Sequence, residues 1–312
     1  MKVLLTGISG FVGTNLALRL HLLGYEVHGI VRKESLHHWR IAELGSGVII
    51  HEGTLMDKDG VAQIVQGVRP DCIFHLATYG AYPNQKDSTL IFQSAVTGTL
   101  NLLLAAKAAG VEMVVNIGSS SEYGTKDHPM EEGDLLQPST SYGAAKAAQT
   151  LLCQAFVLEQ GLPIITLRLF SVYGPFEEQG RLFPTLLRNL MGNTDAPLAS
   201  PKTARDFIYV EDVVEACILA STRPDLSGKV FNIGSGTQET LQSVVKTAVE
   251  VTQSTSALLW NSFPARPFDT AMWVSSSEQS RTVLKFKPRY TLKEGIEKTA
   301  TWIKQHRNLY EK

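Results

Sequence analysis

The chain has 312 residues, 44% of them hydrophobic, and its 29 lysines and arginines nearly balance its 30 acidic residues. This length suits one large domain or two closely joined ones, and it is too great for a peptide-sized binding module. A nearly neutral chain lacks the positive field that attracts nucleic acids or anionic membranes, so its charge favours small-molecule partners.

The three cysteines, Cys72, Cys153 and Cys217, are scattered within apolar runs. Their odd number and their setting indicate reduced, buried thiols rather than a disulfide framework. The segment before Gly7 is too short for the apolar region of a signal peptide, and no apolar run approaches the ~20 residues of a membrane span. We therefore expect a cytoplasmic protein with no nucleic-acid and no membrane partner.

The first predicted elements are a short apolar strand over residues 2–6, a glycine-rich turn and a helix over residues 14–23. Glycines let the backbone approach a pyrophosphate, and a helix N-terminus supplies free N–H groups and partial positive charge. The arrangement therefore predicts a dinucleotide-binding loop. Its expected cofactor contacts are Gly7, Ser9, Gly10, Phe11, Val12 and Gly13.

The end of the second predicted strand, residues 26–31, should lie beside the adenosine ribose of that cofactor. An acid at this point binds the ribose hydroxyls of NAD, whereas a cation accepts the 2′-phosphate of NADP. The chain has Arg32, Lys33 and Ser35 here, which favours NADP(H). Glu34 lies close by, so NAD(H) and a merely solvated basic turn remain alternatives.

The next predicted strands cover residues 47–51 and 72–77, with a helix over residues 59–67 between them. Cys72 and His75 face opposite sides of a strand, so they make no metal pair, and no metal is expected. Ligands bind at the carboxyl ends of parallel strands. We therefore expect cofactor contacts from Leu76, Ala77 and Thr78, followed by Tyr79 and Tyr82 as substrate-wall residues or as ordinary packing.

An apolar, alanine-rich helix is predicted over residues 96–110, and a buried strand over residues 113–118 follows it. That strand ends in the hydroxyl-rich run Ser119-Ser120-Ser121-Glu122-Tyr123-Gly124. These hydroxyls either form a turn or polarise a substrate carbonyl.

Tyr142 and Lys146 form a candidate proton-transfer pair, because alanines around them favour a helix and residues four apart share a helical face. A free tyrosine titrates near ~10, and lowering its pKa to about 7 requires roughly 4 kcal/mol of differential stabilisation of the phenolate. A fixed ammonium supplies part of this stabilisation.

These motifs together resemble the extended short-chain dehydrogenase/reductases that act on nucleotide sugars. The resemblance rests on the glycine loop, the Ser-Ser-Ser-Glu-Tyr-Gly strand end, the Tyr142–Lys146 pair, Arg-Leu-Phe-Ser-Val-Tyr-Gly-Pro at residues 168–175 and Ala-Arg-Asp-Phe-Ile-Tyr-Val at residues 204–210. It covers nearly the whole chain, and its motifs are specific for the superfamily rather than for a substrate.

The resemblance implies a role for each residue of the centre. Tyr142 is the acid/base at the sugar oxygen, Lys146 holds the nicotinamide ribose, and Ser120 shares the oxygen, with Ser119 or Ser121 as alternative matches. Glu122 corresponds to the glutamate that related dehydratases carry in this segment, although Ser121 stands where the usual aspartate of an Asp-Glu pair would be.

The resemblance also implies a nucleotide-diphosphate sugar as the partner, gripped by arginines whose fork holds two phosphate oxygens. The expected contacts are Ser171, Arg181, Arg205 and Arg266, together with the two loop tyrosines. Two positions depart from the family pattern, because relatives commonly carry asparagine where this chain has Ala95 and Ser171.

Three kinds of hydride-transferring enzyme fit these motifs: a 4-ketoreductase, a 4-epimerase and a dehydratase. The basic residues after the second strand favour exchangeable NADP(H), so we expect an NADPH-dependent 4-ketoreductase of a nucleotide-linked 6-deoxy-4-ketohexose, then a 4-epimerase with retained NAD, then a 4,6-dehydratase. A non-catalytic dinucleotide-binding regulator is the remaining class, which the presence of both Tyr142 and Lys146 disfavours.

The predicted fold is α/β, a Rossmann-like doubly wound parallel sheet with a smaller mixed α/β substrate-binding domain. Residues 1–168 and about 208–234 are assigned to the dinucleotide-binding domain, and about 169–207 with 235–312 to the substrate domain. Further strands are expected at residues 162–169 and 229–233, and helices at 182–191, 240–251 and 292–306. The resemblance implies a homodimer built on helices 96–110 and 143–158.

Overall fold

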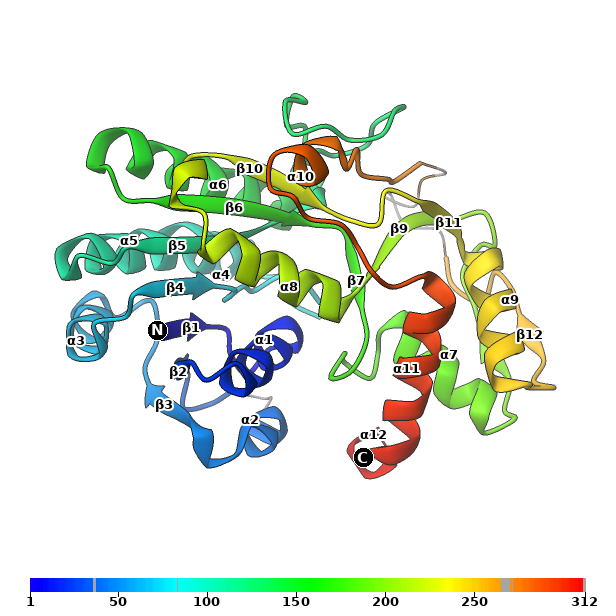
Figure 1. Cartoon of the computed structure of the whole chain (residues 1–312). Helices are drawn as coiled ribbons and strands as arrows, with labels where there is room; N and C mark the ends of the chain where they lie inside the picture. Colours follow the sequence, from blue (N-terminus) through cyan, green and yellow to red (C-terminus); the bar gives the residue numbers. More distant parts are fainter. Residues whose placement is uncertain (36–37, 83, 265–269, 271, 311–312) are drawn as a thin grey trace.

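The structure is a computed structural model that describes residues 1–35, 38–82, 84–264, 270 and 272–310. Its centre is a seven-stranded sheet in the order β10-β6-β5-β4-β1-β2-β3, in which every neighbouring pair is parallel (Figure 1). The strands are β1 Lys2–Thr6, β2 Glu26–Val31, β3 Val48–Glu52, β4 Cys72–His75, β5 Met113–Ser119, β6 Ile164–Leu169 and β10 Val230–Ile233. This order confirms the predicted doubly wound, Rossmann-like sheet.

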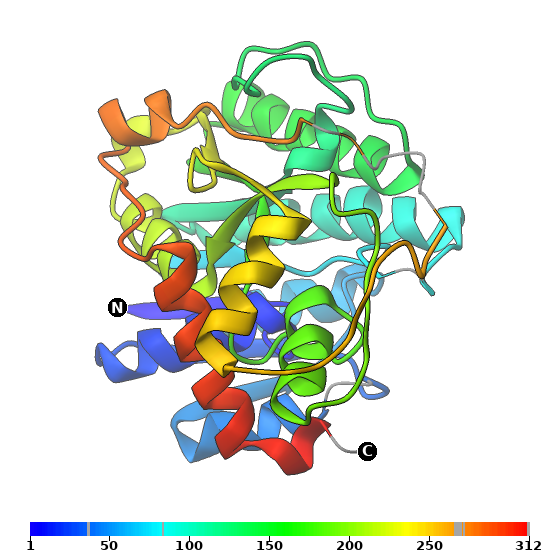
Figure 2. The same cartoon turned by 90° about the vertical axis from the view of Figure 1, so that its right-hand side faces the viewer.

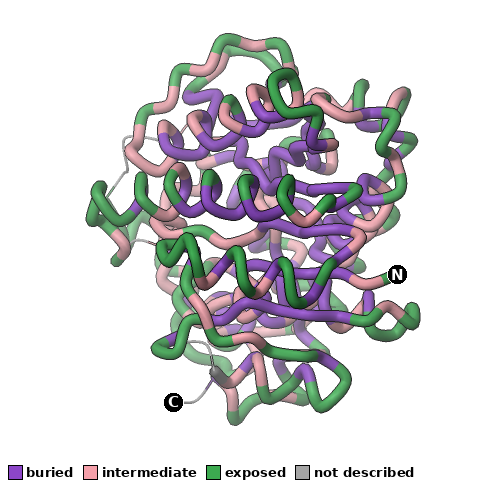
Figure 3. Tube along the Cα trace, turned by 90° about the vertical axis from the view of Figure 1, so that its left-hand side faces the viewer, coloured by how far each residue is buried: buried purple, intermediate pink, exposed green. Residues whose placement is uncertain are grey.

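Helices cover both faces of this sheet because successive strand residues point to opposite sides. Val3 and Leu5 pack in one core with α1 and α8, whereas Leu4 packs in the other with α3 and α5. Figure 3 shows the buried residues concentrated in the strands and along the inner sides of the helices. The helices are α1 Phe11–Leu22, α2 His38–Leu44, α3 Lys58–Val68, α5 Gly98–Ala109, α6 Ser141–Gln160 and α8 Val210–Ser221, with 3-10 turns η1 Gly45–Gly47 and η4 Pro224–Leu226.

The helix predicted over residues 96–110 begins earlier than its apolar pattern indicated. It consists of α4 Ser88–Phe92, a π-helical turn η2 Gln93–Thr97 and α5, and it ends at Gly110 in the left-handed conformation. Asp87 caps its start by accepting the backbone N–H groups of Thr89 and Leu90. By length and composition, residues 88–109 would suffice for a membrane span, but half of the apolar window is buried inside the fold.

The later chain forms a second, smaller lobe beside the carboxyl ends of the main strands (Figure 2). Its sheet has the order β11-β9-β7, from β11 Gln238–Thr240, β9 Ala204–Tyr209 and β7 Ser171–Tyr173, and a two-stranded piece joins β8 Ala196–Pro197 to β12 Leu258–Leu259. The short helix α10 Glu278–Thr282 lies against β10 of the main sheet (Figure 1), and the helices of the second lobe are α7 Leu182–Met191, α9 Leu241–Thr252, α11 Leu292–Gln305 and α12 Arg307–Tyr310. They enclose a separate apolar core that includes Phe183, Leu187, Val244 and Ile296.

The buried Arg40 side chain links the two lobes by hydrogen bonds. The Arg40 guanidinium, fully buried, donates from Nε and Nη2 to the carbonyl oxygen of Phe176 at 3.0 and 2.7 Å, and from Nη2 to Glu178 at 2.9 Å. From the other end of the chain, the Tyr310 hydroxyl donates to the carbonyl of Glu177 at 2.8 Å. The segment after β7 is therefore held from both sides.

Candidate active site

The turn between β1 and α1 has the shape that a bound pyrophosphate requires. Gly7 has a φ of 72°, and a Cβ there would lie 2.7 Å from the Ala77 nitrogen. A Cβ on Gly13 would collide with the Gly7 carbonyl. Gly10 is the N-cap of α1 without any side-chain cap, so the amides of Phe11 and Val12 are free of a competing side chain. This cradle fits a dinucleotide phosphate.

The end of β2 lies beside the glycine turn. The hydroxyls of Ser9 and Ser35 are 3.2 Å apart, and Ser35 is buried. Arg32 and Lys33 are exposed at the same end of β2. Two cations and a buried hydroxyl therefore lie at the end of β2, next to the glycine turn.

The residues that follow β4 pack directly against the glycine turn. The backbone N–H of Leu76 donates to the Thr6 carbonyl, and that of Ala77 donates to the Thr6 hydroxyl. The buried His75 ring lies 2.7 Å from the Thr6 hydroxyl through Nδ1 and 2.8 Å from the Thr99 hydroxyl through Nε2. Because Thr99 donates its proton to the Ala95 carbonyl, its oxygen accepts from Nε2–H of His75, and in the neutral ring Nδ1 then accepts from the Thr6 hydroxyl. Burial lowers the pKa of His75 to about 3.

Tyr142 lies in the first turn of α6, which Thr140 caps by accepting the Gly143 N–H at 3.0 Å. Gly143 is required at this point because a Cβ would collide with the Ser121 carbonyl, so α6 packs directly on the end of β5. Burial raises the pKa of the Tyr142 phenol, while hydrogen bonds with the side chains of Ser119 and Thr78 lower it. Two strand ends thus meet at one phenolic oxygen.

Of the three serines, Ser119 is the one whose side chain lowers the pKa of Tyr142, whereas Ser120, the residue favoured from the sequence, has a different partner. Ser119 is the last residue of β5 and the N-cap of the 3-10 turn η3 Ser120–Glu122, where its Oγ accepts the Ser121 N–H at 3.1 Å. Ser120 belongs to the turn and accepts the indole N–H of Trp273 at 3.0 Å. The change of backbone direction at residue 119 separates the two serines.

Glu122, expected to be a catalytic acid, is instead part of a buried ion pair. Its two oxygens accept the backbone N–H of Ser119 at 2.8 Å and Nε of Arg168 at 2.7 Å. Arg168 also donates to the Tyr123 hydroxyl at 2.9 Å, and both charged side chains are buried. A carboxylate with both oxygens engaged in this way supports the backbone of Ser119 rather than exchanging protons with a substrate.

Lys146 follows Tyr142 by four residues on the same helix and is buried. Its ammonium donates to the carbonyl of Ile117 at 2.5 Å and to Oε1 of Gln149 at 2.8 Å. Burial lowers the pKa of Lys146 to about 8, against the opposing effect of the Glu122 charge. A fixed cation is therefore present one helical turn from the phenol.

One wall beside Tyr142 is formed by the loop after β4 and the start of α7. Arg181, the N-cap of α7, donates from Nη1 to the Ala81 carbonyl at 3.5 Å, and its guanidinium lies 5.9 Å from the Tyr82 ring centre. Its Nε is 3.8 Å from Oε1 of Glu177, whose pKa burial raises to about 8. Tyr79, by contrast, packs against the cluster of Ile91, Ala95 and Ala145, which supports the packing alternative for this residue.

The second lobe contacts the end of β5 through Trp273, which lies beside Arg205. Arg205 on β9 lies with its guanidinium 5.3 Å from the ring centre of Trp273, whose indole reaches Ser120. Ser171 begins β7 and pairs with Phe207 of β9. Arg266 lies outside the described residues. Trp273 was not predicted, since its position follows from a contact between segments far apart in the chain.

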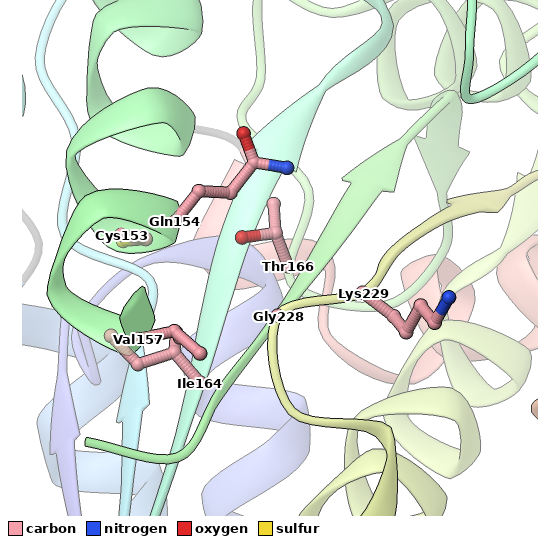
Figure 4. A pocket seen from close by; sticks show the side chains of 7 residues that line it. All are labelled: Cys153, Gln154, Val157, Ile164, Thr166, Gly228 and Lys229. Carbon is pink, nitrogen blue, oxygen red and sulfur yellow. The ribbon is translucent and has the colours of Figure 1, made fainter. Parts of the chain in front are cut away.

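Two pockets lined by described residues lie away from these side chains. One, of about 330 Å³, is lined by Lys2, His28, His51, Gln63, Ile64, Gly67 and Val68. Another lies between α6 and the strands β6 and β10, where Gln154, Thr166 and Lys229 line it (Figure 4). Neither is lined by a candidate site residue. Within the described ranges, no group of three His, Cys, Asp or Glu residues is arranged to hold a metal ion.

The comparisons with known proteins agree with this geometry. Residues 3–234 match the model of the NAD dependent epimerase/dehydratase family. The chain is 29% identical to a UDP-N-acetyl-alpha-D-glucosaminuronate decarboxylase of Bacillus cytotoxicus, over 98% of this chain and 99% of the relative.

Solved structures of epimerases also superpose on nearly the whole chain. An epimerase of Methanothermobacter thermautotrophicus superposes with a TM-score of 0.91 at 27% identity, covering 99% of this chain and 94% of the other. A UDP-glucuronic acid 4-epimerase of Bacillus cereus, solved with UDP-glucuronic acid and NAD, superposes with a TM-score of 0.88 at 26% identity, covering 98% and 99%.

Proposed function

This chain belongs to the NAD dependent epimerase/dehydratase family, and we propose that it is an oxidoreductase that acts by hydride transfer at a carbon of a nucleotide-diphosphate sugar. The observation that carries the proposal is the Tyr142 phenol. The side chains of Ser119, at the end of β5, and Thr78, after β4, lower its pKa, and Lys146 follows it by one helical turn.

Tyr142 exchanges a proton with the sugar oxygen whose carbon gains or loses hydride. Ser119 stabilises the charge that develops on this oxygen, because its hydroxyl is fixed by the capping turn. Lys146 holds the ribose next to the reacting ring and favours the phenolate by its charge. A bound nicotinamide supplies or accepts the hydride.

The cofactor we propose is NADP(H), held by the glycine turn and by the end of β2. The cations Arg32 and Lys33 suit a 2′-phosphate, and Ser35 adds a hydroxyl beside Ser9. NAD(H) is the alternative, which the bound NAD of the Bacillus cereus epimerase favours. In this arrangement residues 1–168 and about 208–234 serve the cofactor, and the remainder serves the substrate.

The reaction we propose is reduction of a 4-ketosugar, with a nucleotide-linked 6-deoxy-4-ketohexose as the substrate. Glu122 is committed to Arg168, which removes the acid that a dehydratase would use. A 4-epimerase is the second candidate, supported by the 4-epimerase activity that the Bacillus cereus relative's name states. The diphosphate is assigned to Arg205 and Arg266, and the sugar to the wall of Tyr82 and Arg181.

We also propose a homodimer in the cytoplasm. Four leucines are exposed on α5 and α6, namely Leu100, Leu104, Leu151 and Leu158. Apolar residues gathered on two neighbouring helices are typical of a surface that another protein covers, and two such pairs can form a four-helix contact. The three cysteines are free and buried, which agrees with a reducing compartment.

The decisive experiment is mass spectrometry of the nucleotide released from freshly purified, denatured protein, together with fluorescence titrations of NADPH and NADH. Empty protein that prefers NADPH supports the ketoreductase, which exchanges its cofactor in every cycle. Retained NAD at near one per chain supports the epimerase. Protein that binds neither nucleotide contradicts the proposed function.

A further inference from the structure

We propose that Gln149, Asn116 and Thr166 form a buried polar chain that positions the ammonium of Lys146 for catalysis. These three residues are not among those assigned to the substrate. Their effect on catalysis depends on the role proposed for Lys146. Gln149 is its central member, because it alone joins Lys146 to the other two residues.

This chain of hydrogen bonds runs from α6 into the middle of the main sheet. Lys146 donates to Oε1 of Gln149 at 2.8 Å, and Nε2 of Gln149 donates to Oδ1 of Asn116 on β5 at 2.6 Å. Nδ2 of Asn116 then donates to the hydroxyl of Thr166 on β6 at 3.1 Å. All four side chains are buried, so water cannot replace these partners.

The direction of the chain follows from the chemistry of Lys146. An ammonium has only donors, so Gln149 must present its oxygen to Lys146 and its NH₂ group to Asn116. Asn116 therefore presents its oxygen to Gln149 and its NH₂ group to Thr166. Lys146 has three N–H donors, and within the described residues Gln149 and the Ile117 carbonyl accept two of them. The third is left for a cofactor hydroxyl.

The chain also determines how easily Lys146 loses its charge. An ammonium in an apolar interior is disfavoured unless acceptors face it, and Gln149 supplies one of the two. The other titratable groups that act on Lys146 are Glu122 from η3, Cys153 from α6 and His75 from β4. Burial raises the pKa of Cys153 to about 12 and lowers that of His75 to about 3, so neither titrates at mildly alkaline pH.

The test is the pH dependence of NADPH binding, measured by fluorescence from about pH 7 to about 9.5. Wild-type affinity should fall as Lys146 loses its proton. In Gln149→Leu the fall should begin about one pH unit lower, which gives about fivefold weaker binding near pH 8 and approaches tenfold at higher pH. In Gln149→Glu it should begin at higher pH, because a carboxylate favours the ammonium.

The matched control is Gln154→Leu, at a glutamine of the same helix that lines the pocket of Figure 4. Its binding curve should follow that of the wild type. A Gln149→Leu curve with the wild-type midpoint would overturn the proposal, even if the variant were less stable, since a purely structural role does not move this midpoint.

A second measurement does not need the cofactor. Urea midpoints of Gln149→Leu, Lys146→Met and the double variant form a double-mutant cycle. Gln149→Leu should lower the midpoint clearly when Lys146 is present and much less in the Lys146→Met background. Additive shifts of the urea midpoint would contradict the proposed coupling between Gln149 and Lys146. Wild-type protein that binds neither NADPH nor NADH would instead reject the proposed function and leave the cycle as a valid test.

Discussion

The carboxylate of Glu122 and the guanidinium of Arg168 meet at 2.7 Å with both side chains buried. The same carboxylate accepts the backbone N–H of Ser119, the residue whose hydroxyl reaches Tyr142. Glu122 therefore holds the backbone of Ser119 beside Tyr142, and its charge also raises the pKa of the Tyr142 phenol.

Glu122→Ala should destabilise the protein by about 3–5 kcal/mol, because it leaves the Arg168 charge buried without a partner. Urea unfolding followed by circular dichroism measures this loss. The control is Glu131→Ala, at an exposed acid of the following loop, which should change stability little. Equal midpoints for the two variants would show that the ion pair does not stabilise the fold.

Tyr142→Phe should lower kcat by about 10²–10⁴-fold while cofactor affinity stays unchanged, because only the proton donor is lost.

Ser119→Ala should lower kcat by about 10²-fold or more, as loss of a donor to a developing oxyanion does. Ser120→Ala is the matched control and should have a much smaller effect, since its hydroxyl is engaged by Trp273. A larger loss in Ser120→Ala than in Ser119→Ala would restore Ser120 as the reacting serine.

Replacing Arg32 and Lys33 together by alanine should weaken NADPH binding by about tenfold or more and leave NADH binding unchanged. Charge-assisted hydrogen bonds to a 2′-phosphate contribute this amount, and NADH has no such phosphate. Fluorescence titration gives both dissociation constants. Glu34→Ala serves as the control at the same turn, and an equal loss for NADPH and NADH would speak against recognition of the phosphate.

Acid should destabilise the protein through His75. Its pKa is lowered to about 3 in the folded state, against about 6.5 in the unfolded chain, so the unfolded state binds more protons between these values. The contribution of His75 is present above about pH 6.5 and is lost at about 1.4 kcal/mol per pH unit as the pH falls towards 3.

Urea unfolding at several pH values measures this slope. His75→Gln should have a lower stability at neutral pH but a shallower decline in acid. His128→Gln is the control, because His128 is exposed and its acidic neighbours raise its pKa, so the decline should persist in that variant. A wild-type slope in His75→Gln would exclude His75 as its source.

Leu104→Glu combined with Leu151→Glu should convert the proposed dimer to a monomer, because the charges would lie in the apolar face of α5 and α6. Light scattering at several concentrations measures the mass. Leu22→Glu, at an exposed leucine of α1, should leave the mass unchanged. A monomeric wild-type protein would contradict the dimer directly.

Most of the fold could be predicted because its signals are local. The glycine turn, the apolar strands and the end of β2 each follow from a few consecutive residues, and parallel strands place their carboxyl ends at one edge. The pairing of Tyr142 with Lys146 is likewise a property of one helical turn.

The parts that could not be predicted depend on contacts over long distances in the chain. The choice between Ser119 and Ser120 is decided by where β5 ends and a 3-10 turn begins, which three consecutive serines do not reveal. The partner of Glu122 is Arg168, on a different strand. The start of the long helix at Ser88 was missed because α4 and the π-helical turn η2 break the apolar period of α5.

The place of β10 at the edge of the main sheet has a consequence for biosynthesis. Ribosomes make β6 well before β10, so β6 emerges with one side of its backbone unpaired and able to bind other chains. The sheet gains its last strand only after β7, α7, β8 and β9 of the second lobe have been synthesised, and the contact of Tyr310 with Glu177 forms later still. Nascent chains of this protein are therefore expected to expose the edge of β6 until β10 has been synthesised.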